Sequence, residues 1–355
     1  MPRRILLLIT DLKVGGTPTV VRELAIRLNN PRRAVHVEVA CLAPWGPVAD
    51  QLKSAGISVT AFDARGGRDF IEVARRLQTL VKTERIDTLF SFLVHANLVA
   101  AFAMKGLKGV RFFQSIQTTQ PKPAWHWWLQ RCARHRAERF IVPSHAIVDN
   151  AVRKSGIAKE RFVVIPNAID PTDFSKHDVF KGDRVRVGFL GRLDPVKRIG
   201  LLVDAMHELR ELPADCAIFG YGPERETIAA RIRSRGLEST VTLRGAVNKP
   251  SEALAEMDVL VLPSKGEGFG LVLIEAMACG VPVIASAHGG VTDVIQHEHN
   301  GLLVRDDESI ANAVRRLVND ADLRSKLITN GLTTVREKFT WDVVLPQYHK
   351  ALGLG

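Results

Sequence analysis

The sequence predicts an α/β protein made of two doubly wound, Rossmann-like domains that face each other across a cleft. Short apolar runs typical of buried strands alternate with amphipathic helical stretches along the chain, and this alternation restarts near residue 184. A length of 355 residues allows two domains, each with its own core. Apolar residues make up 46% of the chain and charged residues 25%, which excludes a disordered or fibrous protein.

In the first half, apolar runs predict strands and the stretches between them predict helices. The expected strands are 5–10, 35–41, 59–62, 88–92, 111–116, 139–142 and 162–165. The expected helices are 19–28, 48–55, 70–83, 97–105, 123–137 and 144–155. Strands that recur between helices pair in parallel, with helices on both sheet faces. We therefore expect the first domain over 1–175.

The second half repeats the alternation after a polar connection over 176–183, where we place the domain boundary. The expected strands are 185–190, 216–220, 241–243, 259–262, 283–286 and 301–304. The expected helices are 199–209, 224–235, 251–255, 270–278, a turn near 293, and 309–319, followed by further stretches at 323–329, 335–339 and 341–352. The second domain should thus cover 184–338. Ligands of such sheets bind outside the carboxyl ends of the strands.

Bulk features narrow the class of protein. The four cysteines form no Cys-x-x-Cys pair, so we expect neither a zinc site nor a disulfide framework, but reduced thiols in the cytoplasm. The apolar run at 5–9 is too short for a signal peptide and is followed by Asp11, so it predicts a first strand. No window is long and apolar enough to span a bilayer, and any membrane contact should be peripheral.

Positive charge is concentrated in the first half. Residues 1–175 contain 26 Lys and Arg against 14 Asp and Glu, whereas 176–355 contain 23 against 24. This asymmetry indicates either an anionic partner for the first half, such as lipid headgroups, nucleic acid or an acidic substrate, or simply a basic soluble surface.

The stretch 258–290 carries the strongest candidate site. A strand at 259–262 leads through a Gly-rich loop to a helix that begins near Gly270, and two carboxylates, Glu267 and Glu275, stand eight residues apart around that start. Free backbone N–H groups at a helix start suit a phosphate. Nearby acids suit sugar hydroxyls, so this segment could hold a sugar nucleotide.

Three further glycine turns follow expected strands. Gly15 and Gly16 precede a helix and can approach an oxyanion, although a plain tight turn explains them as well. In Gly191–Lys197 the cations Arg192 and Lys197 can neutralise a diphosphate, or can simply be solvated charges at a helix start. The turn at 220–224 is more typical of a scaffold than of a ligand contact.

These motifs resemble one enzyme family. The stretch 267–275 is similar to the Glu-x7-Glu signature of retaining glycosyltransferases of family GT4, which have the GT-B architecture of two facing Rossmann-like domains. The resemblance covers nearly the whole chain in the expected order. The other matching stretches are 15–16, 91–97, 143–144, 165–170, 191–197, 263–264, 276–283 and 289–291.

The resemblance implies roles for individual residues. Glu275 would bind the nucleotide ribose and Glu267 the hydroxyls of the donor sugar. The diphosphate would be held by Arg192 and Lys197, by backbone amides of Gly268, Phe269, Gly270 and Leu271, and by Gly15 and Gly16 of the other domain. His95 matches a histidine that lies beside the transferred sugar. We count His95, Arg192, Lys197 and Glu267 as catalytic. A last helix, about 340–355, would cross back to the first domain.

Such enzymes move a sugar from a nucleotide diphosphate sugar to an acceptor with retention at the anomeric carbon. We expect a UDP-sugar, with a GDP-sugar as the second option, and a glycan or lipid-linked glycan acceptor in polysaccharide or glycoconjugate synthesis. No cofactor or metal is expected, since Arg192 and Lys197 can balance the diphosphate.

Our expectations about the acceptor and the localisation come from one stretch that is rich in aromatic and basic residues. Trp125, Trp127 and Trp128 stand among the arginines of 131–139, a composition that favours an anionic membrane surface, although the tryptophans could instead pack in the core or cover the acceptor cleft. We expect a cytoplasmic protein at the inner face of the membrane. The alternatives are a sugar-nucleotide epimerase of GT-B shape and a basic nucleic-acid-binding protein; no zinc finger or RNP motif supports the latter, and no nucleic-acid partner is expected.

Overall fold

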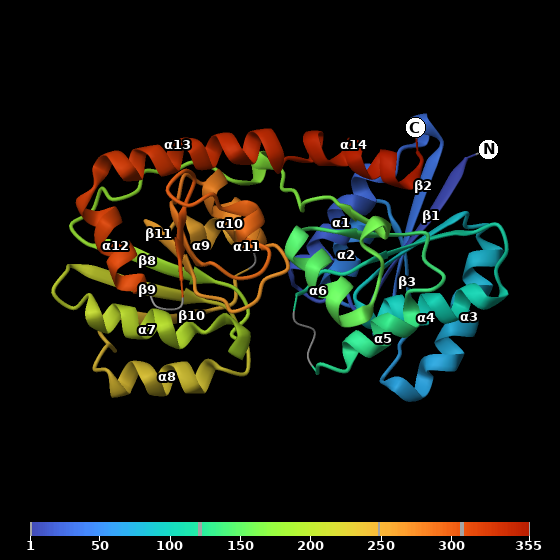
Figure 1. The fold of residues 1–355 in the computed structure, drawn as a ribbon, viewed down its shortest axis with the longest axis horizontal. Helices are drawn as coiled ribbons and strands as arrows, with labels where there is room; N and C mark the ends of the chain where they lie inside the picture. Colours follow the sequence, from blue (N-terminus) through green and yellow to red (C-terminus); the bar gives the residue numbers. More distant parts are fainter. Residues whose placement is uncertain (1, 120–122, 248, 306–308, 355) are drawn as a thin grey trace. The chain divides into compact units, whose positions relative to one another are not determined.

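The computed structural model describes residues 2–119, 123–247, 249–305 and 309–354. The chain forms two compact units (Figure 1): unit 1 is Met1–Asn167 with Val344–Gly355, and unit 2 is Ala168–Val343. The division corrects both expected boundaries, because 168–175 and 340–343 belong to unit 2. The connection after Asn167 is tied to unit 2 by hydrogen bonds from the Phe180 N–H to Asp258 (2.8 Å) and from the His177 N–H to the Cys279 carbonyl (3.2 Å).

Unit 1 contains a seven-stranded parallel sheet in the order β3-β2-β1-β4-β5-β6-β7. Its strands are β1 (Arg3–Ile9), β2 (Val35–Cys41), β3 (Ser58–Ala61), β4 (Thr88–Phe92), β5 (Arg111–Ser115), β6 (Arg139–Val142) and β7 (Phe162–Val164). The central strands are apolar and buried on both faces, as strands of a parallel sheet covered by helices must be.

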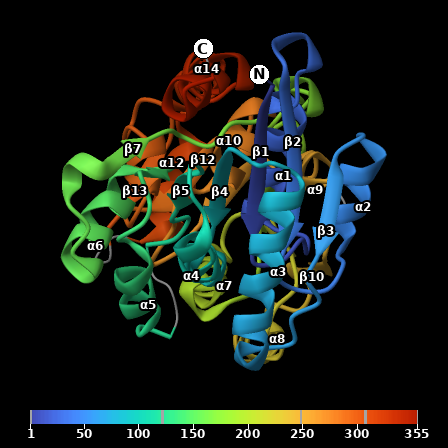
Figure 2. The same cartoon turned by 90° about the vertical axis from the view of Figure 1, so that its right-hand side faces the viewer.

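The helices of unit 1 occupy the expected places between strands. They are α1 (Gly16–Leu28), α2 (Pro47–Ser54), α3 (Phe70–Thr83), α4 (Val94–Ala103), α5 (His126–Ala133) and α6 (His145–Ser155). The ends of α6 show how sequence sets a boundary: the Ser144 side chain accepts from the Ile147 N–H, and Gly156 takes a left-handed conformation. Helices α4 and α5 lie side by side (Figure 2).

Unit 2 repeats the architecture with a six-stranded parallel sheet in the order β10-β9-β8-β11-β12-β13. Its strands are β8 (Val185–Leu190), β9 (Ala214–Phe219), β10 (Val241–Gly245), β11 (Val259–Leu262), β12 (Val283–Ser286) and β13 (Leu302–Val304). A single apolar core joins this sheet to its helices. The two doubly wound sheets confirm the predicted fold class.

The helices of unit 2 cover both faces of its sheet. They are α7 (Ile199–Glu208), α8 (Arg225–Ser234), α9 (Pro250–Leu254), α10 (Leu271–Ala278), α11 (Val291–Val294), α12 (Ile310–Asn319) and α13 (Ala321–Lys338). Helix α7 packs against α8 and α12, and α10 packs against α9 and α13. Where the sequence suggested two stretches, α13 is one continuous helix. Its Gly331 allows close packing, since a Cβ there would lie 3.2 Å from Met277 Cγ.

The last helix, α14 (Trp341–Leu352), starts in unit 2 and continues into unit 1 from Val344. In unit 1 the buried Tyr348 ring lies 6.4 Å from the Phe90 ring, and Arg111 donates to the Leu352 carbonyl at 2.6 Å. Short 3₁₀ helices occupy the connections: η1 (Pro31–Arg33), η2 (Gly67–Asp69), η3 (Met104–Gly106), η4 (Lys159–Arg161), η5 (Pro171–Asp173) and η6 (Pro195–Lys197).

Each sheet has one point where the strand order reverses. In unit 1 this point lies between β1 and β4, with Ile9 opposite Phe92, and in unit 2 it lies between β8 and β11, with Val187 opposite Val259. The loops that leave neighbouring strands at the carboxyl end of such a point splay to opposite faces and leave room for a ligand. We call this end of each sheet its carboxyl edge.

Candidate functional site

The carboxyl edge of unit 2 brings together three loops that the sequence singled out. They follow β8 (191–198), β11 (263–270) and β12 (287–290). The Lys265 N–H donates to the Val196 carbonyl at 2.8 Å, and the Gly290 N–H donates to the Glu267 carbonyl at 2.8 Å. Backbone hydrogen bonds thus join the middle loop to both of its neighbours.

An ion pair lies at the centre of this edge. Lys197 Nζ donates to Glu267 Oε1 at 2.5 Å, and both side chains are largely buried, with 19% and 11% of their surface exposed. The two residues were predicted to contact adjacent parts of one ligand, and the structure places them in direct contact. Each charge neutralises the other, which makes burial of both side chains tolerable.

Glycines hold the Glu267 loop from the other side. Gly289 has a φ of 66°, and a Cβ there would lie 2.5 Å from the Glu267 carbonyl oxygen. A Cβ at Gly290 would lie 2.2 Å from the Gly268 carbonyl oxygen. Only glycine allows this approach, so the backbone around Glu267 is held in one position.

Arg198 is a functional candidate that sequence reasoning missed. It has a φ of 49° and begins α7, and its guanidinium donates from Nε to the Pro263 carbonyl (2.9 Å) and from Nη2 to Ser286 Oγ (3.1 Å). One side chain therefore joins the ends of β8, β11 and β12. In the sequence, Arg198 could have been noticed because it follows Lys197. The direction of its side chain, however, depends on the left-handed backbone conformation of Arg198, which the sequence does not reveal.

Helix α10 begins next to the backbone amides that the sequence predicts to bind an anion. Gly270 precedes the helix with a φ of 93°, and no described side chain caps the helix start at Leu271. Phe269 is buried and packs edge-on against Phe339, with 5.5 Å between the ring centroids. Its side chain therefore fixes the loop and does not face a ligand.

Glu275 lies one turn into α10, half-buried. Burial raises its pKa from 4.5 to about 7; burial also raises the pKa of Cys279 to about 11, with a smaller contribution from the Glu275 carboxylate. A carboxyl group kept in an apolar environment is costly to ionise, and such groups cluster at functional sites.

Arg192 is not part of the central ion pair. Its side chain is 70% exposed and pairs with Asp194 at 2.8 Å. The loop that carries it is nevertheless fixed, because a Cβ at Gly220 would lie 1.8 Å from the Gly191 carbonyl oxygen and the Leu193 N–H donates to the Tyr221 carbonyl. The turn at 220–224 therefore acts as scaffold for the Arg192 loop.

In unit 1, the other predicted residues stand at the carboxyl edge of that sheet. Gly15 and Gly16 begin α1 directly after β1, with no side-chain cap and no acidic residue in the first turn. His95 is the second residue of α4 and follows β4, the neighbour of β1. Leu93, between β4 and α4, has a φ of 73°, a strained conformation of the kind found at functional sites.

His95 has an aromatic neighbour that the sequence did not indicate. Its ring lies edge-to-face against His126 of α5, with 4.8 Å between centroids. Burial lowers the pKa of both histidines, and His95 further lowers the pKa of His126. His126 could have been predicted as a site residue because it follows β5, the strand beside β4. The sequence argument considered only the neighbouring tryptophans.

Of the three tryptophans, Trp127 packs in the core of unit 1, whereas Trp125 and Trp128 are 55% and 63% exposed. Two of the nearby arginines have structural partners, since Arg134 donates to the Gly156 carbonyl at 2.7 Å and Arg139 donates to the Glu160 carbonyl at 2.5 Å. The expectation of core packing is thus correct for one tryptophan of the three.

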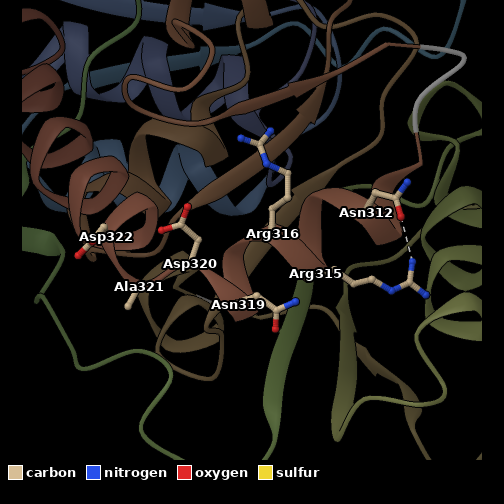
Figure 3. A pocket seen from close by; sticks show the side chains of 7 residues that line it. All are labelled: Asn312, Arg315, Arg316, Asn319, Asp320, Ala321 and Asp322. Carbon is tan, nitrogen blue, oxygen red and sulfur yellow. Dashed lines mark hydrogen bonds between the residues drawn. The ribbon is translucent and has the colours of Figure 1, made fainter.

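A surface hollow of about 650 Å³ lies at the corner between α12 and α13. Figure 3 shows Arg315 directed toward Asn312 on the same helix. Arg315 also pairs with Glu211 at 2.7 Å, and Arg316 pairs with Glu298 at 2.5 Å. Both arginines of this hollow are therefore held in ion pairs at the surface.

Two family models match the chain. The model "Glycosyltransferase Family 4" matches residues 14–173, and "Glycosyl transferases group 1" matches residues 171–334. The chain belongs to glycosyltransferase family 4. Together the two matches span the carboxyl edges of both sheets, including Gly15, His95, Lys197 and Glu267, and confirm the family that the motifs predicted.

Curated relatives of this family member include several glycosyltransferases. The D-inositol 3-phosphate glycosyltransferase of Stackebrandtia nassauensis is 31% identical over 237 residues, 58% of this chain and 53% of the relative. The N-acetyl-alpha-D-glucosaminyl L-malate synthase of Bacillus anthracis is 36% identical over 156 residues, 43% of this chain and 41% of the relative. The chain thus spans about half the length of the curated relatives it matches.

Solved structures confirm the GT-B fold. Anabaena Alr3699/HepE in complex with UDP-glucose superposes with a TM-score of 0.86 at 21% identity, covering 99% of both chains. Sucrose-phosphate synthase from Thermosynechococcus elongatus gives a TM-score of 0.81 at 21% identity, covering 98% of both. At this identity the similarity establishes the fold alone.

Proposed function

We propose that this family 4 member is a retaining glycosyltransferase that moves a sugar from a nucleotide diphosphate sugar to a glycan or lipid-linked glycan acceptor in polysaccharide or glycoconjugate synthesis. The observation that carries the proposal is the Lys197–Glu267 pair, held between glycine-clamped loops at the carboxyl edge of unit 2. A UDP-sugar is the favoured donor and a GDP-sugar the second option. The UDP-glucose complex of Alr3699/HepE supports this choice.

The ion pair explains how one edge could hold a charged donor. An incoming diphosphate competes with Glu267 for Lys197, so the lysine exchanges one anionic partner for another. The released Glu267 carboxylate then accepts hydrogen bonds from sugar hydroxyls. The exposed Arg192 adds a second cation, the amides of 268–271 cradle the phosphates, and Glu275 accepts from the ribose.

The reaction needs no protein nucleophile. The bond between the anomeric carbon and the leaving phosphate oxygen breaks through an oxocarbenium-like state, and the acceptor hydroxyl attacks from the same face. Its proton passes to the departing phosphate oxygen. Lys197 stabilises the negative charge that grows on the diphosphate, which is the largest contribution expected from this edge. The roles of Gly15, Gly16 and His95 stay predictions.

We also propose that the reaction proceeds without a metal ion, because Lys197 and Arg192 supply the positive charge that a divalent cation would otherwise provide. Transfer should be equally fast with EDTA and with added Mg²⁺. A rate that falls to background in EDTA and returns with Mg²⁺ would contradict this part of the proposal.

For localisation, we propose a cytoplasmic protein that touches the inner membrane face through α5. Among the described residues no helix has both the length and the apolarity to cross a bilayer. The exposed Trp128 and Arg131 of α5 offer an aromatic ring and a cation to an anionic surface. Flotation with anionic vesicles at low salt should carry the protein upward, and Trp128→Ala should reduce the floated fraction. Absence of flotation would exclude this contact.

A nucleotide screen tests the proposed donor class. UDP should raise the melting temperature of the full chain more than GDP or ADP, because a ligand that binds only the folded state stabilises it according to its occupancy. No shift with any of the three would contradict the proposal. Once an acceptor supports turnover, the anomeric coupling constant of the product, measured by NMR, separates retention from inversion.

A further inference from the structure

Three rings form a continuous cluster at the carboxyl edge of unit 1. His126 lies in the middle, with the His95 ring edge-to-face at 4.8 Å and the Trp125 ring edge-to-face at 4.6 Å. His95 comes from α4, and Trp125 and His126 come from the start of α5. We call His95, His126 and Trp125 the ring cluster.

The ring cluster presents its outer members to solvent. His126 is only 8% exposed, whereas Trp125 is 55% exposed and His95 is also exposed. An exposed indole offers a flat apolar face, and an imidazole offers one hydrogen-bond donor and one acceptor. Apolar faces with a few fixed polar groups are typical of sites for small organic ligands.

The electrostatics of the ring cluster favour an uncharged ligand. Burial lowers the pKa of both histidines, which favours their neutral forms. Among the residues that the structure describes, no lysine or arginine contributes to the lowered pKa of either histidine. A phosphate or carboxylate would find no fixed cation within the cluster, whereas hydroxyl groups find neutral donors and acceptors.

Buried hydrogen bonds fix the two helices beneath the rings. Asn97 of α4 donates to Gln130 of α5 at 2.9 Å, and Gln130 donates to Gln114 of β5 at 2.7 Å. Ser91 of β4 donates to the Asn97 side chain at 2.7 Å. These four side chains, which we call the amide network, are almost completely buried. They preorganise the ring cluster by locking α4 to α5 just inside it.

We propose that the ring cluster is a carbohydrate subsite that holds a pyranose ring of the acceptor, with Trp125 against the apolar C–H face of the sugar and His126 bonded to a hydroxyl. This inference rests on the proposed glycosyltransfer and specifies its acceptor as a carbohydrate at the contact point. It adds Trp125 and His126 to the residues that select the substrate.

The test is saturation-transfer NMR on the full chain with methyl glycosides of glucose, galactose, mannose and N-acetylglucosamine as probes, with and without UDP. At least one glycoside should receive saturation at its ring C–H protons. Trp125→Ala should weaken binding about tenfold, the size of one aromatic contact, and Trp125→Phe should restore most of it. His126→Phe keeps a ring but removes its nitrogens and should also weaken binding.

Trp128→Ala is the matched control, because Trp128 is a neighbouring tryptophan of similar exposure, 63% against 55% for Trp125, outside the ring cluster. It should leave glycoside binding unchanged. Absence of saturation transfer to all four probes, or equal losses in Trp125→Ala and Trp128→Ala, would overturn the inference. A loss of UDP binding in Trp125→Ala would overturn it as well.

Calorimetry with UDP separates this inference from the proposed function. UDP binding together with absent glycoside binding would overturn the subsite and leave the donor proposal intact. Glycoside binding that is lost in Trp125→Ala, in a chain that does not bind UDP, would support the subsite and contradict the proposed transferase.

Discussion

The carboxyl edges of the two sheets have the same topology and opposite chemistry. The edge of unit 2 is ionic: Lys197 and Glu267 pair at 2.5 Å, Arg198 joins three strand ends, and glycines clamp the loop between them. On the edge of unit 1, the loops after β4 and β5 carry the ring cluster, whose aromatic side chains stand on the amide network. One strand order can therefore prepare either a site for a charged ligand or a site for an uncharged one, according to the loops that follow the strands.

The largest expected effect of this difference is in Lys197→Ala. Removal of the charge that stabilises the leaving diphosphate should lower kcat at saturating donor by about a hundredfold or more. Steady-state rates with a UDP-sugar measure it, and Lys181→Ala, which removes an exposed lysine paired with Asp178 in the same unit, is the control. An unchanged kcat in Lys197→Ala would exclude this residue from the chemistry.

A second change tests the glycine clamp, by which we mean the close packing of Gly289 and Gly290 against the backbone of Glu267 and Gly268. In Gly290→Ala the new Cβ meets the Gly268 carbonyl oxygen, so the Glu267 loop must move and UDP affinity should fall by at least tenfold, with a loss of stability of about 1–3 kcal/mol. Gly182→Ala, where the nearest atom to a Cβ lies 3.8 Å away, should change neither quantity. Calorimetry and thermal melting provide the readouts, and wild-type affinity in Gly290→Ala would show that the clamp is dispensable.

Glu275 is expected to bind the donor and, when ionised, to lower the stability of the fold. Because its pKa is raised from 4.5 to about 7, the fold loses stability as the pH rises through this interval and the carboxyl ionises. Glu275→Gln should therefore gain up to about 2 kcal/mol at pH 8 and little at pH 4.5, while binding the donor about tenfold more weakly.

Melting curves at both pH values measure the stability of Glu275→Gln, with the exposed Glu252→Gln as control. A variant that is less stable than wild type at pH 8 would show that the ionised carboxylate has a stabilising partner.

The smallest effect on donor binding should come from the amide network of unit 1. Gln130→Leu leaves Asn97 and Gln114 without their buried partner and should cost about 1–3 kcal/mol of stability, yet UDP affinity should not change. Gln51→Leu, at an exposed position, should cost less than about 0.5 kcal/mol. A loss of UDP affinity in Gln130→Leu would mean that the amide network also supports donor binding.

The sequence located the strands and the loops of the candidate site, because buried parallel strands are continuous apolar runs and strand ends are marked by glycine and proline. It could not show that Lys197 bonds Glu267, since the two are seventy residues apart and meet only through the neighbouring positions of β8 and β11. Arg198 and His126 were missed for a related reason: their directions depend on a left-handed turn and on helix packing.

The central claim is that Lys197 contacts the donor and that the ring cluster does not. Isothermal calorimetry of UDP binding to the full chain tests this claim most directly. The account predicts that Lys197→Ala weakens UDP binding by about tenfold or more, the loss of one charge-assisted contact, while Trp125→Ala binds UDP as wild type does. Unchanged UDP affinity in Lys197→Ala, together with a loss of affinity in Trp125→Ala, would contradict it.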